Sequence, residues 1–153
     1  MRNLFSKLYL FFFKNKGLHN VFFLYFSQKE IIIYMLHSLE FLDIVNDAKS
    51  RVKEINVQQA QERIKSGATM IDVREDNEWH AGHVVGAIHL GRGIIERDII
   101  KAIPEKNKEI ILYCGGGFRS ALSADNLQKM GYTNVVSMDG GWKAWNDAGG
   151  EIE

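Results

Sequence analysis

The sequence predicts a single α/β domain in which helices flank a central, mostly parallel sheet of five strands. Two observations support this prediction. From about residue 38 onward, short apolar runs typical of strands alternate with helical patterns, as in βαβ units. The chain also has 153 residues, of which 46% are apolar and 25% charged, and these values suit one globular domain with its own core. We therefore expect one domain over residues 38–153 and an N-terminal extension over residues 1–37.

The first half of the domain is predicted to begin with a helix over residues 38–55. Apolar side chains recur there at helical spacing, at Phe41, Val45, Ala48 and Val52. Residues 55–67 then indicate a short strand followed by a helix that ends near Gly67. The remaining elements of this half are a strand, a turn with a short helix, and another strand, over residues 68–75, 75–83 and 86–90.

The second half of the domain continues the alternation. A helix over residues 94–103 should stop at Pro104, the only proline, because proline lacks a backbone N–H and clashes with a helical backbone. The clearest strand is "EIILYC", residues 109–114, in which four apolar residues lie between a charged stretch and glycines. The last elements are a helix with Gly131 as its C-cap, a strand and a short helix, over residues 120–131, 133–141 and 142–150.

Residues 1–34 differ in composition from the rest of the chain. They hold five Lys and Arg against one Glu, together with seven of the nine Phe. Their apolar runs are six residues long and are separated by charges, whereas a membrane span needs about 20 apolar residues. Two interpretations stay open: an amphipathic segment that contacts a membrane surface, or translated upstream sequence before a true start at Met35. The function predicted below does not depend on this choice.

Charge and cysteine content restrict the class of protein. The formal net charge is zero, so nothing indicates a nucleic-acid partner. The single cysteine, Cys114, can form no internal disulfide, and we therefore expect a reducing, cytoplasmic compartment. His80 and His83 have a spacing that two metal ligands could use. No third ligand is evident, however, and we expect these histidines to serve a turn and its packing, with no metal site.

The stretch "YCGGGFRSALSA" places three glycines between this cysteine and an arginine. Glycine loses more backbone entropy on folding than any other residue, so Gly115, Gly116 and Gly117 are expected to serve a special backbone shape. With positive φ these glycines can turn successive N–H groups toward one centre at the carboxyl end of the strand. The following helix, starting at about Arg119–Ser120, adds the free N–H groups of its first turn. The positive field of these N–H groups favours the thiolate of Cys114, which is the nucleophilic form.

At these residues the sequence resembles the rhodanese-type sulfurtransferases, which carry sulfane sulfur as a cysteine persulfide. Cys114 and Arg119 form a C-x4-R loop within "ILYCGGGFRSA". The stretch "MIDVREDNEWHAGHVVGAIHL" is similar to the family's Ile-Asp-Val-Arg-Glu and Glu-aromatic-x-x-Gly-His-Ile-x-Gly-Ala motifs, and "GYTNVVSMDGGWKAW" is similar to its Gly-Gly-x-x-x-Trp end. Together these motifs cover roughly residues 55–146 in the family's order, whereas residues 1–36 show no counterpart.

The resemblance implies a rhodanese-like fold and a sulfurtransferase mechanism. Cys114 would accept sulfur from thiosulfate or a similar donor and pass it to cyanide or a thiol, including a protein thiol. The covalent persulfide is then the intermediate, and no cofactor is expected. Arg119 and the loop amides of Gly115 to Ser120 would hold the donor anion and the persulfide. Ser120 could also hydrogen-bond the sulfur or cap the helix.

The sequence departs from the family's pattern at two places. Val85 stands where the family usually has a proline, which should alter only the stiffness of a turn. No charged residue precedes Arg119 in the loop, so little besides the backbone and Phe118 is expected to select the sulfur donor.

Other polar and aromatic residues lie near the ends of predicted strands. We expect Asp72, Arg74 and Glu75 to make structural hydrogen bonds rather than to touch the substrate. Arg92 follows another strand and could lie at the mouth of the same pocket. Packing in the core or at its rim is the expected role of the remaining candidates, Trp142, Trp145, Met130 and Met138.

Two other functions compete with sulfur transfer. Phosphatases and arsenate reductases of a related fold also use Cys and Arg, but their loop typically has one more residue, which makes room for a tetrahedral phosphate. The spacing of Cys114 and Arg119, and the lack of an Asp just beyond the loop as general acid, favour sulfur over phosphate. A non-catalytic persulfide carrier or interaction module is the other alternative, which the sequence leaves open.

Overall fold

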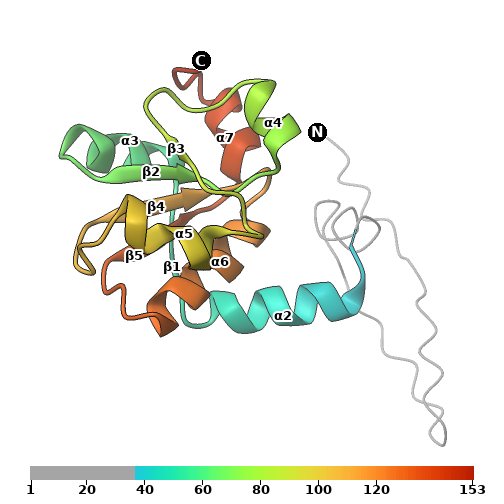
Figure 1. Ribbon diagram of the computed structural model, residues 1–153. Helices are drawn as coiled ribbons and strands as arrows, with labels where there is room; N and C mark the ends of the chain where they lie inside the picture. Colours follow the sequence, from blue (N-terminus) through green and yellow to red (C-terminus); the bar gives the residue numbers. More distant parts are fainter. Residues whose placement is uncertain (1–36) are drawn as a thin grey trace, which may run out of the picture. The chain divides into compact units, whose positions relative to one another are not determined.

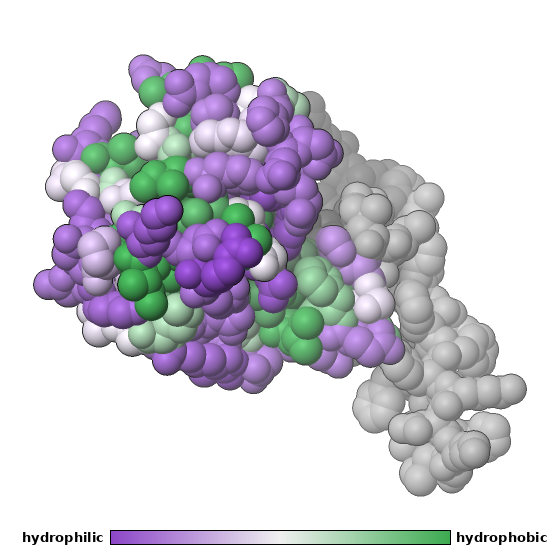
Figure 2. Space-filling model, viewed as in Figure 1, coloured by the Kyte–Doolittle hydropathy of each residue, from purple (hydrophilic) through white to green (hydrophobic). Residues whose placement is uncertain are grey.

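The computed structural model describes residues 37–153 (Figure 1). The two interpretations of residues 1–34 therefore lie outside the described residues. Contacts group residues 43–153 into one compact unit, and the domain boundary predicted at residue 38 stays a prediction. Within the described part of the chain, no helix is long and apolar enough to cross a membrane. The face of the molecule in Figure 2 is mainly hydrophilic, with apolar areas scattered between polar ones.

Five strands and six helices alternate along the described residues, as predicted. The strands are β1 (Lys53–Ile55), β2 (Thr69–Asp72), β3 (Ile88–His89), β4 (Ile110–Tyr113) and β5 (Val135–Met138). They form one sheet in the order β1-β5-β4-β2-β3, and every pair of neighbouring strands is parallel. The helices are α2 (Leu39–Lys49), α3 (Val57–Lys65), α4 (Asp76–His80), α5 (Ile95–Ala102), α6 (Phe118–Lys129) and α7 (Gly141–Asp147). The predicted α/β class with a five-stranded sheet is confirmed.

One predicted element boundary was wrong. The first helix ends at Lys49 instead of continuing to residue 55, because Lys53–Ile55 pairs with β5 as an edge strand. Val52 continues the helical spacing of apolar residues, but it lies in the turn that links α2 to β1, and its side chain is buried there. Helix α6 begins at Phe118, next to the start predicted at about Arg119–Ser120. Its predicted end is confirmed, since Gly131 follows the C-cap with a φ of +90°.

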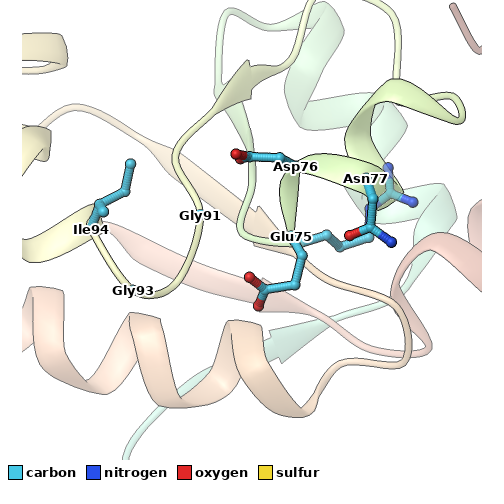
Figure 3. Close-up of a pocket in the computed structure, with 7 residues that line it drawn as sticks. Glu75, Asp76, Asn77, Gly91, Gly93 and Ile94 are labelled. Atoms are coloured by element: carbon cyan, nitrogen blue, oxygen red, sulfur yellow. The ribbon is translucent and has the colours of Figure 1, made fainter.

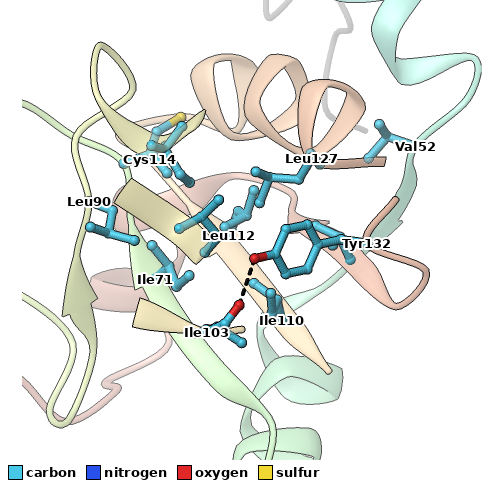
Figure 4. Close-up of a cluster of buried hydrophobic side chains, with 14 residues drawn as sticks. Val52, Ile71, Leu90, Ile103, Ile110, Leu112, Cys114, Leu127 and Tyr132 are labelled. Carbon is cyan, nitrogen blue, oxygen red and sulfur yellow. Dashed lines mark hydrogen bonds between the residues drawn. The ribbon is translucent and has the colours of Figure 1, made fainter. Parts of the chain in front are cut away.

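Side chains of the central strand β4 alternate between two buried clusters. Ile110 and Leu112 belong, with Cys114, to a cluster completed by residues of α5 and α6 (Figure 4). Ile111 and Tyr113 belong to a second cluster, to which α3 and α7 contribute. Both faces of the sheet are therefore covered, as is usual for parallel sheets. The loops at the carboxyl ends of the strands are left to carry a site.

The order of the strands marks where that site should lie. After β2 the chain moves outward to the edge strand β3 and then returns to β4, on the other side of β2. Ligands of open α/β sheets bind outside the carboxyl ends of the strands at such a reversal of direction. Asp72 pairs in register with Tyr113. The turn after β2 and the loop after β4 therefore leave the sheet side by side.

We predict that Asp125, a buried carboxylate on α6, makes the domain less stable in acid. The carboxylate accepts hydrogen bonds from Nε of Arg51 at 2.9 Å and from Nζ of Lys129 at 2.6 Å. The bonds from Arg51 and then from Lys129 lower the pKa of Asp125 from 3.8 to about 2, although burial opposes this change. The pKa is lower in the folded state, so this stabilisation is present above about pH 3.8 and is lost as the pH falls through about 2.

Replacement of Asp125 with Asn should therefore lower the free energy of unfolding at neutral pH by about 1–2 kcal/mol. This range is smaller than the full pKa shift would give, because Arg51 is partly exposed and solvent weakens the ion pair. Urea denaturation of both proteins at about pH 7 and about pH 3 measures the effect. The difference between wild type and variant should shrink in acid. A difference that stays constant with pH would contradict the assignment.

Candidate active site

The sulfur of Cys114 lies directly after β4, at the carboxyl edge of the sheet. The residue is 1% exposed and packs in the cluster shown in Figure 4. Its Sγ accepts a hydrogen bond from the backbone N–H of Gly117 at 3.1 Å and a second from the hydroxyl of Ser120 at 3.6 Å. Two donors therefore point at the atom that would carry negative charge as a thiolate or a persulfide.

The three loop glycines have three different surroundings. Only Gly117 has a positive φ, +97°, and it is the N-cap of α6. The expectation that Gly115 and Gly116 share this conformation is wrong. At Gly115, a Cβ atom would lie 3.2 Å from Nη2 of Arg119, so its lack of a side chain leaves room for the guanidinium. Gly116 is exposed, and a Cβ atom added to it would have no neighbour within 4 Å.

A second glycine turn, Gly140–Gly141, supports the loop through backbone bonds. Both residues have positive φ, +72° and +51°, and they lead into α7. The N–H of Trp142 donates to the carbonyl oxygen of Cys114 at 2.6 Å, and the N–H of Lys143 donates to that of Gly115 at 3.2 Å. The carbonyl oxygens of Cys114 and Gly115 are thus bound by backbone N–H groups of α7, which hold this part of the loop in place.

The guanidinium of Arg119 is held by carboxylates of α4 and of its N-cap residue. Nη1 and Nη2 donate to the two carboxylate oxygens of Glu78 at 2.6 and 2.9 Å, and Nη1 lies 3.6 Å from Oε1 of Glu75. The bonds from Arg119 hold the pKa of Glu78 below its ordinary value, against the opposing effect of burial. The same pairing raises the pKa of Arg119. Both groups are therefore charged at neutral pH.

A chain of hydroxyl groups leads from β5 to the sulfur. Ser137, fully buried on β5, donates to Oγ of Ser120 at 2.8 Å, and Ser120 donates in turn to Sγ of Cys114. In this direction every hydroxyl proton has an acceptor. If Ser120 instead donated to Ser137, no other acceptor among residues 37–153 would receive the proton of Ser137. Satisfying all the buried groups therefore requires that Ser120 donate to the sulfur.

The residues at the end of β2 form the predicted structural contacts. The Arg74 guanidinium is 3% exposed, and its Nη2 donates to Oδ2 of Asp72 and to the carbonyl oxygen of Gly82, both at 2.7 Å. Its guanidinium carbon also lies 4.3 Å from the centroid of the Trp142 ring. Arg74 thus ties the end of β2 to Gly82, just after α4. Glu75 also makes a structural contact, with its Oε1 3.6 Å from Nη1 of Arg119, and the prediction that it does not touch the substrate stays a prediction.

A pocket of about 480 Å³ opens beside this turn (Figure 3). Its walls are formed by the start of α4 and by the loop after β3, through Arg74, Glu75, Asp76, Asn77, Gly91, Gly93 and Ile94. Neither Cys114 nor its glycine loop lines this pocket, so the prediction that Arg92 could lie at the mouth of the Cys114 site stays a prediction. The two neighbours of Arg92 line the pocket, but Arg92 does not, and its Nε is buried without a hydrogen-bond partner among the described residues.

The histidines of α4 and the following turn make local contacts. Nδ1 of His80 lies 2.6 Å from the carbonyl oxygen of Asp76, and the ring of His83 stacks on that of Trp79. No group of three or more His, Cys, Asp or Glu side chains in residues 37–153 is arranged to hold a metal ion. The expected packing residues behave as predicted: Met138 and Trp145 are buried, and Met130 and Trp142 pack against the two clusters.

The structure brings some of the predicted site residues together and separates others. Gly117 and Ser120 contact the sulfur of Cys114, whereas Arg119 points to Glu78, and the ring of Phe118 lies 5.3 Å from Nζ of Lys49. Sequence reasoning missed three participants, Glu78, Ser137 and Gly141. Glu78 belongs to the sequence motif that ends at Gly82–His83. The sequence therefore pointed to Glu78, but it did not show that its partner is Arg119.

Comparison with known proteins agrees with this geometry. The family model for the rhodanese-like domain matches residues 56–148. The thiosulfate sulfurtransferase GlpE of Ectopseudomonas mendocina is 33% identical over 96 residues, which cover 63% of this chain and 86% of that protein. The uncharacterized protein YqhL of Bacillus subtilis is 34% identical over 96 residues, which cover 61% of this chain and 72% of that protein.

A solved structure shows the same fold. The protein of unknown function RPA3614 from Rhodopseudomonas palustris, described as a possible tyrosine phosphatase, superposes with a TM-score of 0.67 at 30% identity. The match covers 76% of this chain and 96% of that one. The likeness therefore includes nearly the whole of that structure.

Proposed function

Because the chain belongs to the rhodanese-like domain family, we propose that it is a sulfurtransferase that moves sulfane sulfur through a persulfide on Cys114. The observation that supports this most is the position of Sγ, which follows the central strand and accepts hydrogen bonds from Gly117 and Ser120. Thiosulfate or a similar molecule would be the donor, and cyanide or a thiol the acceptor. GlpE, named a thiosulfate sulfurtransferase, supports this class of substrate.

The reaction proceeds in two displacements at sulfur. The thiolate of Cys114 attacks the outer sulfur of thiosulfate, the S–S bond of thiosulfate breaks, and sulfite leaves with the electron pair. Cyanide or a thiolate then attacks the outer sulfur of the persulfide and takes it, and the thiolate of Cys114 returns. The N–H of Gly117 and the hydroxyl of Ser120 stabilise the negative sulfur in both steps.

A phosphatase is the second candidate, favoured only by the description of the Rhodopseudomonas palustris neighbour as a possible tyrosine phosphatase. The four residues between Cys114 and Arg119 leave a smaller loop than phosphate requires. Arg119 is also bound to Glu78, next to Gly115 of the loop. The shorter loop disfavours attack at a tetrahedral phosphorus, whereas attack at a terminal sulfur needs less room. A persulfide carrier that loads but does not turn over differs from the enzyme only in the second displacement.

Intact mass of the full chain after incubation with thiosulfate tests the proposal. The wild type should gain the mass of one sulfur atom, cyanide should remove it with release of thiocyanate, and Cys114→Ser should gain nothing. Repeated release of thiocyanate distinguishes the enzyme from a carrier, which would load once and release slowly. Absence of the adduct, together with hydrolysis of an aryl phosphate, would replace the proposed function by the phosphatase.

The compartment remains a separate prediction. A lone cysteine suits a cytoplasmic location, and the persulfide chemistry needs Cys114 in its reduced form.

A further inference from the structure

Arg119 is the only cation of the loop, and its anion-binding edge is already occupied. Glu78 contacts both terminal nitrogens of the guanidinium, in the paired geometry that an anionic substrate would otherwise use. Glu75 is a second carboxylate, 3.6 Å from Nη1. The pair lies against the loop itself, since a Cβ on Gly115 would lie 3.2 Å from Nη2 of Arg119 and 3.7 Å from Oε1 of Glu78.

The formal charges of Arg119, Glu75 and Glu78 sum to −1. Two carboxylates face one guanidinium, and among the described residues no second cation lies within ion-pair distance of Glu75 or Glu78. The pairing with Arg119 holds the pKa of Glu78 below its ordinary value, so this carboxylate stays ionised at neutral pH.

Three other cations near the loop are bound to carboxylates of their own. Lys49 pairs with Glu54 at 2.8 Å, Lys143 with Asp147 at 2.6 Å, and Arg74 with Asp72 at 2.7 Å. A donor that approaches Cys114 thus meets no free positive charge from these three groups.

On the basis of the proposed function, we propose that Glu78, by neutralising Arg119, determines whether sulfur donors with one or with two negative charges are preferred. The carboxylate disfavours donors that bring two negative charges to the loop, such as thiosulfate. It leaves access to donors with one charge on a terminal sulfur, such as an alkyl thiosulfonate or a hydropersulfide. Glu78 is a specificity-determining residue in this assignment, because it acts on the donor through its charge.

Two donors that differ by one charge make the test direct. With thiosulfate, the thiolate of Cys114 takes the outer sulfur and sulfite leaves. With methanethiosulfonate, CH3SO2S⁻, the same thiolate takes the terminal sulfur, the S–S bond breaks, and methanesulfinate leaves with the electron pair. Both reactions give the same persulfide, so their rates differ only through recognition and the leaving group.

The experiment measures kcat/KM for thiocyanate formation with each donor, in the wild type and in Glu78→Gln. Glutamine keeps a hydrogen-bond acceptor for Arg119 and removes the charge. The preference for methanethiosulfonate over thiosulfate should fall about tenfold, the scale of one unit charge a few ångströms away in a partly solvated site. The change should come from a higher kcat/KM for thiosulfate.

Three controls separate charge from structure. Glu78→Asp keeps the charge and should keep the wild-type preference. Glu109→Gln breaks the Arg63–Glu109 ion pair, which is exposed to a similar degree, and should also leave the preference unchanged. In the wild type, added salt should raise kcat/KM for thiosulfate more than for methanethiosulfonate, because salt screens the repulsion.

The outcomes distinguish this inference from the proposed function. Sulfur transfer with the same donor preference in the wild type and Glu78→Gln would overturn the inference alone, and so would an equal loss of activity toward both donors. If neither donor loads the wild type, the proposed function fails and the inference fails with it. A wild-type salt response equal for both donors would also count against the inference, and this measurement does not depend on the folding of any variant.

Discussion

Replacement of Gly141 with alanine is expected to lower the free energy of unfolding by about 3 kcal/mol or more and to stop the loading of Cys114 with sulfur. Gly141 has a φ of +51°, which L-residues with a Cβ rarely adopt. Its surroundings add a larger penalty. A Cβ there would lie far inside contact distance of the carbonyl oxygen of Cys114 and 3.0 Å from the carbonyl carbon of Gly115.

The consequence reaches the sulfur through the backbone. The atoms that would have to move belong to the loop itself, and they are backbone atoms, which cannot rotate away as a side chain can. The bond from the N–H of Trp142 to the carbonyl oxygen of Cys114 would be displaced, and with it the support of the loop by α7. The N–H of Gly117 would then lose its alignment with Sγ. Activity should therefore fall even at temperatures where the variant remains folded.

Gly131→Ala is the matched control, because Gly131 also has positive φ but has nothing within 4 Å of a Cβ. It should be destabilised by about 1–2 kcal/mol from backbone conformation alone, with an unchanged rate of sulfur loading. Urea denaturation and intact mass after thiosulfate measure the two effects. Equal destabilisation of the two variants, or normal loading of Gly141→Ala, would show that contact with the loop is unimportant.

Much of the fold could be predicted from local patterns. Within "EIILYC", the strand Ile110–Tyr113 is apolar along its whole length because β4 is buried on both faces, and this pattern can be recognised without knowledge of the neighbouring strands. Pro104 and Gly131 marked the ends of α5 and α6 through backbone chemistry that acts within a turn. By contrast, the strand Lys53–Ile55 is too short to show an alternation, and its pairing with β5 decides its conformation.

The site was predictable only where its parts are adjacent in sequence. Cys114, Gly117 and Ser120 lie within one strand-to-helix connection, so their meeting at the sulfur follows from local geometry. Glu78 precedes Arg119 by 41 residues, and their contact depends on the register between β2 and β4. The sequence motif indicated that Glu78 belongs to the family pattern. It could not show that its carboxylate neutralises the arginine of the loop.

Replacement of Ser120 with alanine is expected to slow the loading of Cys114 by about 10- to 100-fold. Loss of one hydrogen bond to a developing negative charge typically costs about 10²–10³ in rate, and the 3.6 Å separation from Sγ makes this bond weaker than most. Ser137→Ala should have a smaller effect, about 3- to 10-fold, because it acts only by orienting the hydroxyl of Ser120. The rate of sulfur gain in single-turnover reactions with thiosulfate, followed by intact mass, measures both.

The double variant tests whether the two hydroxyls act as one chain. If Ser137 works through Ser120, the variant Ser120→Ala/Ser137→Ala should be no slower than Ser120→Ala alone. Multiplied effects would show that Ser137 acts by another route. Ser123→Ala is the control, because Ser123 is equally buried on α6 and its hydroxyl has no hydrogen-bond partner among the described residues. Its removal should leave the loading rate unchanged, since no bond to the sulfur is lost. An effect of the same size in Ser123→Ala would mean that helix packing, rather than a directed hydroxyl, controls the reactivity of the sulfur.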